Sequence, residues 1–146
     1  MNISGTVGAI LSQKGCQIYS VSPDATVFEA IRLMAEKNVG ALLVISGENL
    51  AGVVSERDYT RKVALKGKSS RETQVREIVS SPVISATPNH SVEECMRLMT
   101  SNRVRHLPIL DGHKLVGIVS IGDLVNWTIS AQDAAIEQLK SYIAGR

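Results

Sequence analysis

The chain has 146 residues, of which 44% are hydrophobic and 21% are charged, and this composition is typical of a soluble globular protein of about one domain. The apolar residues occur in runs far shorter than the roughly 18 that cross a bilayer, so we expect neither a membrane span nor disorder. The net charge of +2 and the 3% of aromatic residues argue against nucleic-acid binding, which needs a basic surface and rings for base stacking.

The N-terminal segment Met1–Leu11 has no basic stretch followed by an apolar core, so it does not resemble a secretion signal. The two cysteines, Cys16 and Cys95, suggest no disulfide framework, and we therefore expect a cytoplasmic protein. The three histidines lack metal-ligand spacing among themselves and with the cysteines, and no serine–histidine–aspartate arrangement follows from the spacing. We expect neither a metal site nor an enzyme.

An internal repeat organises the chain. Shifting the sequence by 65 residues leaves fifteen of the thirty-nine positions from Ser20 to Asp58 identical, with no gap. The anchors of this alignment are Pro23 with Pro88, Gly52 with Gly117, and Asp58 with Asp123. The sequence therefore predicts two copies of one unit, 7–66 and 75–130, joined by a polar linker, 67–74, and followed by a C-terminal helix, 131–146.

Each copy begins with a turn at proline and a predicted helix. Thr26 with Glu29, and Ser91 with Glu94, have the spacing of capping boxes. Apolar residues at helical spacing then predict one buried face per helix. These residues are Val27, Ala30, Ile31, Met34 and Ala35 in the first copy, and Val92, Cys95, Met96 and Met99 in the second.

A predicted hairpin of two buried strands follows each helix. Its strands are 41–45 and 50–54 in the first copy, and 107–110 and 114–119 in the second, with glycine in each turn. A second helix is expected after Ser55 and after Ser120. The fold class is therefore α/β (α+β), with the order strand, helix, strand, strand, helix, and two such small units should pack together to complete a core.

The end of the second strand carries the same motif twice, Gly52-Val53-Val54-Ser55-Glu56-Arg57-Asp58 and Gly117-Ile118-Val119-Ser120-Ile121-Gly122-Asp123. In one interpretation Ser and Asp simply cap the helix that follows. In the other, the helix start binds a phosphate and the aspartate accepts the two hydroxyls of a ribose. The duplication favours the second interpretation.

These motifs resemble those of a tandem pair of CBS domains, above all in small free-standing bacterial proteins. The resemblance rests on Ser55–Val63 (SERDYTRKV), Arg105–Gly112 (RHLPILDG) and Ser120–Asp123 (SIGD). It implies two β-α-β-β-α repeats packed with pseudo-twofold symmetry, usually as a homodimer. It also implies clefts that hold AMP, ADP, ATP, NAD or S-adenosylmethionine as a regulatory ligand, with no required cofactor and no catalysis.

The resemblance further implies ligand sites built from both repeats, with Asp58 and Asp123 on ribose and with Arg57, Arg105 and His106 on phosphate. One implied site consists of Ser55, Glu56, Arg57, Asp58, Val83, Ile84, Val104, Arg105, His106 and Pro108. The other consists of Gln17, Ile18, Tyr19, Val39, Gly40, Ala41, Ser120, Ile121, Gly122 and Asp123.

Positive charge is distributed unevenly between these implied sites. The segment from Arg57 to Arg71 carries a local charge of +5, whereas Gly122, Gly40 and Ala41 stand at the matching positions around Asp123. We expect the Asp58 site to bind phosphate more tightly. Pairing of the arginines with Glu56, Glu72 or Glu77, or a charge lent by a second subunit, would remove this difference.

The predicted function is that of a regulatory, adenine-nucleotide-binding module that signals to an unknown protein partner. The alternative is a structural or protein-interaction domain with vestigial nucleotide clefts. The C-terminal segment predicts a helix with one apolar stripe, which packs on its own body or on a second subunit. The stripe consists of Ile129, Ile136, Leu139 and Ile143, with Ala135 and Tyr142 beside it.

Overall fold

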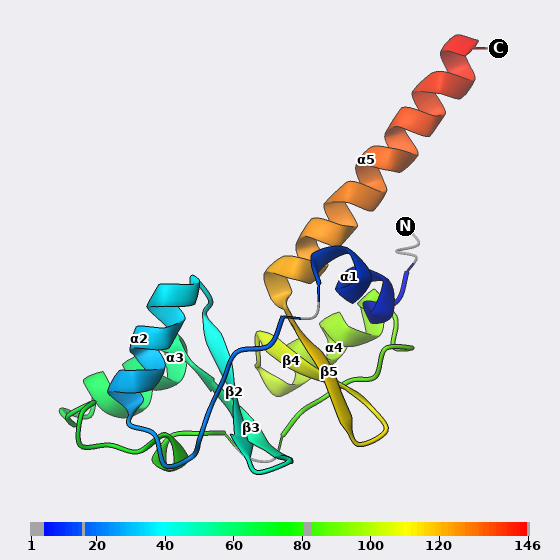
Figure 1. The fold of residues 1–146 in the computed structure, drawn as a ribbon. Coiled ribbons are helices and arrows are strands. Elements are labelled where there is room, and N and C mark those ends of the chain that lie inside the picture. The colour runs from blue at the N-terminus through cyan, green and yellow to red at the C-terminus, as the bar shows by residue number, and fades with distance from the viewer. Residues whose placement is uncertain (1–4, 16, 81–82, 146) are drawn as a thin grey trace. The chain divides into compact units, whose positions relative to one another are not determined.

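The computed structural model describes residues 5–15, 17–80 and 83–145. The chain divides into two compact units (Figure 1). The first-repeat unit is residues 17–83, and the second-repeat unit combines residues 1–16 with 84–146. The N-terminal segment thus packs with the second repeat, which no periodicity in the sequence indicated.

The first-repeat unit holds a three-stranded sheet in the order β1-β2-β3. Strand β1 (Ser20–Val21) pairs in parallel with β2 (Ala41–Ser46), which pairs in antiparallel with β3 (Asn49–Ser55). Helix α2 (Val27–Lys37) precedes the hairpin, and the short helix α3 (Glu56–Tyr59) follows it. A π-helical turn (Thr60–Ala64) and a 3₁₀ turn (Val75–Glu77) complete the unit.

The second-repeat unit repeats this hairpin with β4 (His106–Asp111) and β5 (Lys114–Ser120), between α4 (Val92–Asn102) and α5 (Ile121–Gly145). Helix α1 (Val7–Lys14) joins it from the N-terminus. The expected opening strand is reduced to a single bridge between Ala86 and Ile109.

The backbone preserves the 65-residue repeat in detail. The hairpin register shifts between Val44 and Ile45 in one copy and between Ile109 and Leu110 in the other. Helices α2 and α4 both end on a left-handed residue, Asn38 and Arg103, each at a φ of 55°. The predicted mixed α/β class with two equivalent β-strand hairpins is confirmed.

Both predicted helix starts are capping boxes, and most of the predicted apolar faces are buried. In α2 the prediction is wrong for Ala35, which is exposed, and Ile31 is only half-buried. Ala35 lies about 90° around the helix from the centre of the stripe, at about 100° per residue, so it falls at the rim of the contact. Met96 is likewise half-buried at the edge of the α4 face.

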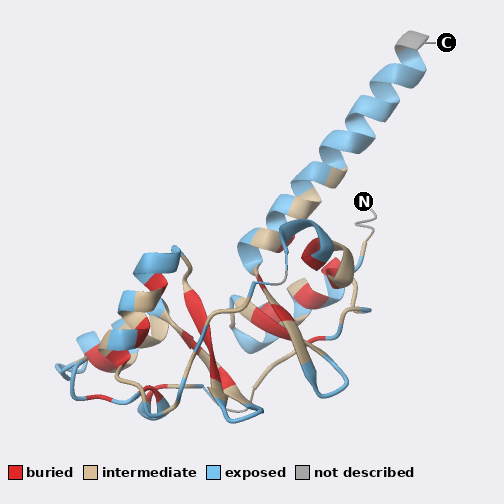
Figure 2. Ribbon diagram, in the orientation of Figure 1, coloured by how far each residue is buried: buried red, intermediate tan, exposed pale blue. Residues whose placement is uncertain are grey.

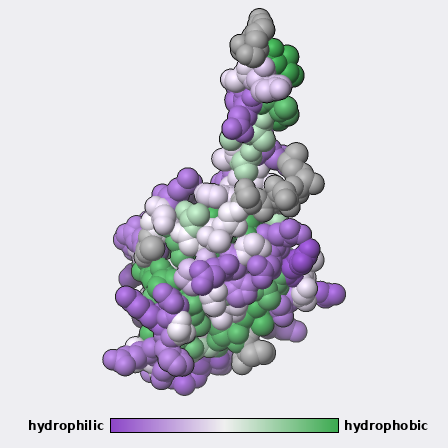
Figure 3. All heavy atoms as spheres, turned by 90° about the vertical axis from the view of Figure 1, so that its right-hand side faces the viewer, coloured by the Kyte–Doolittle hydropathy of each residue, from purple (hydrophilic) through white to green (hydrophobic). Residues whose placement is uncertain are grey.

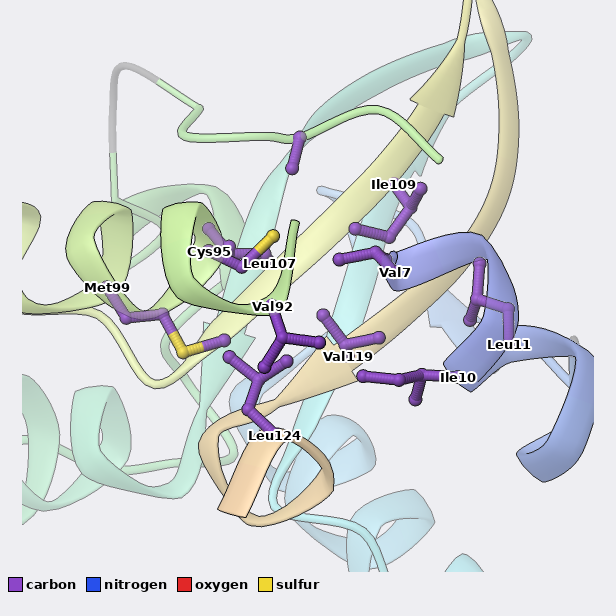
Figure 4. Packing of buried hydrophobic residues seen from close by; sticks show 11 residues of the cluster. Val7, Ile10, Leu11, Val92, Cys95, Met99, Leu107, Ile109, Val119 and Leu124 are labelled. Atoms are coloured by element: carbon purple, nitrogen blue, oxygen red, sulfur yellow. The ribbon is translucent and has the colours of Figure 1, made fainter. Parts of the chain in front are cut away.

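Each unit has its own hydrophobic core. In the second-repeat unit, α1, α4 and the hairpin contribute side chains that converge on one cluster (Figure 4): Val7, Ile10, Leu11, Ala86, Val92, Cys95, Met99, Leu107, Ile109, Val119 and Leu124. The first-repeat cluster is Val27, Ala30, Met34, Leu42, Val44, Val54, Val63, Val75 and Ile78. Burial is concentrated at these elements, while the C-terminal part of α5 is exposed (Figure 2).

Two equivalent glycines allow another segment to approach each hairpin closely. A Cβ on Gly52 would lie 2.5 Å from Cγ2 of Val79, and a Cβ on Gly117 would lie 2.7 Å from Cδ2 of Leu11. A side chain at either position would force its neighbour to shift. The glycine of the repeated motif therefore serves packing, in one copy against Val79 after the 3₁₀ turn and in the other against Leu11 of α1.

The linker packs on the first-repeat unit. Thr73 is buried, its carbonyl accepts from the Val27 N–H at 2.8 Å, and the Ser70 carbonyl accepts from the Phe28 N–H at 3.0 Å. Arg71 lies 4.0 Å from the Phe28 ring centroid. Across the described residues, no helix combines the length and apolarity that crossing a membrane requires.

Candidate functional site

The repeated Ser/Asp motif forms a reciprocal cap at the start of α3 and of α5. Asp58 Oδ2 accepts from the Ser55 N–H at 2.9 Å, and Ser55 Oγ accepts from the Asp58 N–H at 3.2 Å. The same bonds join Ser120 and Asp123, at 2.8 and 3.1 Å. The capping interpretation is therefore confirmed in both copies. It leaves the second carboxylate oxygen of each aspartate for other partners.

A lysine one turn further along the chain lies beside Asp58. The Lys62 Nζ is 3.2 Å from Oδ1 of Asp58, and it also donates to the Ile78 carbonyl at 2.9 Å and to Ser80 Oγ at 3.2 Å. The Asp58 side chain is 15% exposed. This carboxylate is thus largely shielded but still has an edge open to solvent.

A second lysine lies beside Asp123, and it comes from the other end of the sequence. The Lys14 Nζ, at the end of α1, is 2.6 Å from Oδ2 of Asp123 and donates to the Ile118 carbonyl at 3.0 Å. Burial acts to raise the pKa of Asp123, but the hydrogen bonds from Lys14 and Ser120 and the lysine charge outweigh it, so that the pKa lies below its ordinary value. Asp123 is 24% exposed.

Sequence reasoning missed Lys14. The repeat alignment compares only residues that are 65 apart. The lysine beside Asp58 is Lys62, four residues further along the same helical segment, so the alignment gave no reason to look for a lysine elsewhere in the chain. The charge beside Asp123 instead comes from α1. In the 65-residue alignment Lys14 stands opposite Val79. Extending that alignment towards the N-terminus would therefore not have indicated a lysine beside Asp123.

Backbone hydrogen bonds place each motif next to the start of its own hairpin. The Glu56 N–H donates to the Gly40 carbonyl at 3.1 Å, and the Ile121 N–H donates to the Arg105 carbonyl at 2.8 Å. Tyr19 lies beside this region in the first-repeat unit, with the Lys37 Nζ 5.4 Å from its ring centroid. Each unit thus holds parts of both implied sites.

The predicted site residues are divided between the two units. The first-repeat unit contains Gln17, Ile18, Tyr19, Val39, Gly40, Ala41, Ser55, Glu56, Arg57, Asp58 and Val83, and the second-repeat unit contains Ile84, Val104, Arg105, His106, Pro108, Ser120, Ile121, Gly122 and Asp123. That sites are completed across the repeats stays a prediction.

The arginines expected at phosphate have no acidic partner within the described ranges. Arg57 and Arg105 appear in no ion pair there, and Glu77 instead caps its own 3₁₀ turn by accepting from the Gln74 N–H at 2.7 Å. Arg57 is half-buried and Arg105 is exposed. Both guanidinium groups are therefore available to an anionic ligand.

Metal binding receives no support from the part of the chain that the structure describes, since no three His, Cys, Asp or Glu side chains gather there. What the two motifs offer instead is a carboxylate fixed by a helix start, an ammonium beside it and, near Asp58, an arginine. Such a set has the donors and acceptors that a ligand with hydroxyl and anionic groups requires.

A sequence model of the CBS domain matches residues 7–65 and 75–130. The chain belongs to the CBS-domain family. Its fold matches a signal-transduction protein with CBS domains from Burkholderia ambifaria at 51% identity and a TM-score of 0.84, over 88% of this chain and 96% of that one. The predicted resemblance to a CBS-domain pair is thus confirmed.

Two further CBS proteins extend the comparison. The mitochondrial CBS domain-containing protein CBSX3 of Arabidopsis thaliana is 37% identical over 97% of this chain and 73% of its own length. The CBS domain pair of MJ0100, solved in complex with methylthioadenosine and S-adenosylmethionine, is 21% identical with a TM-score of 0.73, over 84% of this chain and 94% of that one. At that identity MJ0100 shares the fold alone.

Proposed function

We propose that this CBS-domain pair is a regulatory module that binds an adenine nucleotide, such as AMP, ADP, ATP or NAD, and relays its occupancy to a protein partner. In this proposal the protein is no enzyme, and the nucleotide is a signal and not a cofactor. The proposal includes a homodimer as the working form.

The observation that carries the proposal is the aspartate fixed at each helix start. A ribose offers two neighbouring hydroxyls, which both donate to one carboxylate. The caps from Ser55 and Ser120 hold each carboxylate in one orientation, so binding a diol costs little further ordering. Partial burial strengthens such bonds by keeping water away. The same arrangement in both repeats supports two related sites.

Phosphate recognition is assigned to the arginines. Arg57 follows two residues after the Ser55 cap, and Arg105 precedes β4. A guanidinium binds phosphate oxygens through paired charge-assisted hydrogen bonds. The adenosyl ligands of the MJ0100 pair are consistent with this ligand class, and the choice among AMP, ADP, ATP and NAD is left to measurement.

Calorimetric titration with AMP, ATP, NAD and S-adenosylmethionine tests the proposal. We expect micromolar affinity for at least one of them, about −7 to −9 kcal/mol, and a loss of about tenfold or more in Asp58→Asn or Asp123→Asn. Asparagine keeps an oxygen for the cap, so the fold should persist. Asp133→Asn, on the exposed part of α5, is the matched control.

Absence of heat and of thermal stabilisation with every adenine compound at millimolar concentration would contradict nucleotide binding. Partner binding that is indifferent to nucleotide would then favour the alternative, a protein-interaction domain whose clefts are vestigial.

A further inference from the structure

Helix α5 carries a row of apolar side chains that its own unit does not cover. Val125, Ile129, Ile136, Leu139 and Ile143 are between 43% and 75% exposed. The C-terminal half of α5 extends beyond α1 and α4 (Figure 1), and hydrophobic side chains gather along one side of it (Figure 3). An exposed apolar row of this length indicates an interaction surface.

The row is separate from the face with which α5 packs on its own unit. That inner face consists of Leu124, which is buried, and Trp127, which packs against the core cluster, with Ala131 half-exposed behind them. At about 100° per residue, the exposed row lies about a third of a turn away from this face. The helix can therefore hold its unit and a partner at the same time.

The spacing of the row is that of a two-stranded coiled coil. When Gln132 is added between Ile129 and Ile136, successive members of the row from Val125 to Ile143 are separated by four, three, four, three and four residues. Isoleucine then occupies every a position, at 129, 136 and 143, and Leu139 occupies a d position. β-branched residues at a with leucine at d favour parallel dimers.

Gln132 decides between a second copy of this chain and an unrelated apolar groove. In a parallel, in-register pair each seam residue faces its own counterpart, so the two Gln132 amides can hydrogen-bond to each other. A foreign apolar groove, or an antiparallel pair that sets Gln132 against Ile143, would leave a buried amide without a partner. The flanking Asp133 and Lys140 meet no like charge in the parallel register.

We propose that α5 is a dimerisation helix that pairs, in parallel and in register, with α5 of a second copy of this chain along the seam Val125, Ile129, Gln132, Ile136, Leu139 and Ile143. This assigns a surface to the homodimer of the proposed function and does not depend on nucleotide binding. The seam spans about 28 Å, at about 1.5 Å per residue.

Sedimentation equilibrium of the full chain at tens of micromolar tests the seam. We expect a dimer for the wild type and a monomer for Ile136→Glu/Leu139→Glu. The circular dichroism spectrum of the variant should still be that of a folded protein, because the hairpins and the core are untouched. The matched control is Gln138→Glu/Ser141→Glu, two exposed positions outside the seam, which should stay dimeric. A dimeric Ile136→Glu/Leu139→Glu variant would overturn the seam, and a monomeric wild type would overturn the homodimer as well.

A cysteine reports the orientation. In a Cys16→Ser background, Ile129→Cys should form a disulfide-linked dimer under mild oxidation, because the two positions face each other only in the parallel register. An antiparallel pair centred near Leu139 would hold them well beyond disulfide reach, so failure to cross-link would overturn the parallel arrangement. Nucleotide titration of the monomeric variant Ile136→Glu/Leu139→Glu measures nucleotide binding without the dimer. The test of the dimer is thereby kept separate from the test of the proposed function.

Discussion

The Lys14 ammonium lies 2.6 Å from Oδ2 of Asp123, so the last residue of α1 is ion-paired to the first turn of α5 across 109 positions of sequence. The pair fastens the N-terminal helix to the carboxylate that we assign to ribose. A ribose hydroxyl that binds Asp123 must share it with Lys14 or displace the lysine. If Asp123 binds ribose as we propose, ligand binding there is coupled to the anchoring of α1.

Lys14→Met tests that pair through its pH dependence. Because the pKa of Asp123 is lowered in the folded protein, the pair stabilises the fold above the ordinary value of 3.8 and loses that contribution as the pH falls through the lowered pKa. We expect Lys14→Met to cost about 1 kcal/mol at pH 7 and to cost less once Asp123 is protonated, when only the hydrogen bond to the Ile118 carbonyl is lost.

Urea unfolding at a series of pH values measures this difference. Lys140→Met, which removes only the exposed contact with Glu137 at 3.7 Å, is the control and should change little at any pH. A Lys14→Met deficit that does not shrink as the pH falls below 3.8, down to the lowest pH at which the protein is folded, would contradict the assigned role of the ion pair.

Gly52→Ala should destabilise the first-repeat unit by about 1–3 kcal/mol. The new Cβ would lie 2.5 Å from Val79 Cγ2 and 3.2 Å from the Ser80 carbonyl, and neither a short branched side chain nor a backbone oxygen moves easily. Gly122→Ala is the matched control, because its nearest neighbour, Ser120 Oγ, is at an ordinary 3.5 Å. Alanine there should stabilise α5 by about 0.5–1 kcal/mol. Equal denaturation midpoints for the two variants would speak against close packing at Gly52.

Local patterns determined the parts of this fold that sequence reasoning predicted. The caps of Thr26 and Ser91, the helix faces and the hairpins depend on residues close together in the chain, so short motifs specify them. The packing of α1 on the second repeat could not be predicted, because it depends on a contact between Leu11 and Gly117 that no periodicity encodes. Lys14 was missed for the same reason.

In the candidate site, too, the local bonds could be predicted and the contacts that depend on the tertiary fold could not. The bonds between Ser55 and Asp58 follow from a four-residue motif and were predicted, whereas their surroundings were not. The positive segment from Arg57 to Arg71 was expected to favour phosphate binding, but within it the ammonium of Lys62 bonds to Asp58 and to the Ile78 carbonyl. A long, flexible side chain takes the nearest acceptors that the tertiary fold supplies, and sequence spacing alone does not identify them.

Cys95 should be nearly inert in the folded protein. Burial, with a smaller contribution from the charge of Glu94, raises the pKa of its thiol from 9.0 to about 11, so the thiolate fraction at pH 8 falls by about a hundredfold. In a Cys16→Ser background, an aromatic disulfide reagent should react slowly with the native protein and rapidly in urea. Native reaction at the rate of an exposed thiol would show that the core around Cys95 opens readily.

The two motifs should differ in their affinity for phosphate, and Lys14 does not remove the difference. Lys14 is engaged by Asp123 and the Ile118 carbonyl, and Lys62 is engaged by Asp58 and the Ile78 carbonyl, so the two ammonium groups are equivalent in this respect. Only the Asp58 motif adds an arginine, Arg57, where the Asp123 motif has Gly122.

A charge-assisted hydrogen bond contributes roughly 1.5–3 kcal/mol, so after losses to desolvation and ordering the affinities for AMP should differ by about tenfold or more. We expect two phases in a calorimetric titration of the wild type, the tighter of which weakens as salt is added. Arg57→Ala should remove that tighter phase alone, and Asp123→Ala the weaker one. Arg32→Ala, which removes only an exposed contact with Glu36 on α2, should leave both phases in place. Two equal phases in the wild type, or a salt-sensitive phase that survives in Arg57→Ala, would show that the arginine does not face the nucleotide.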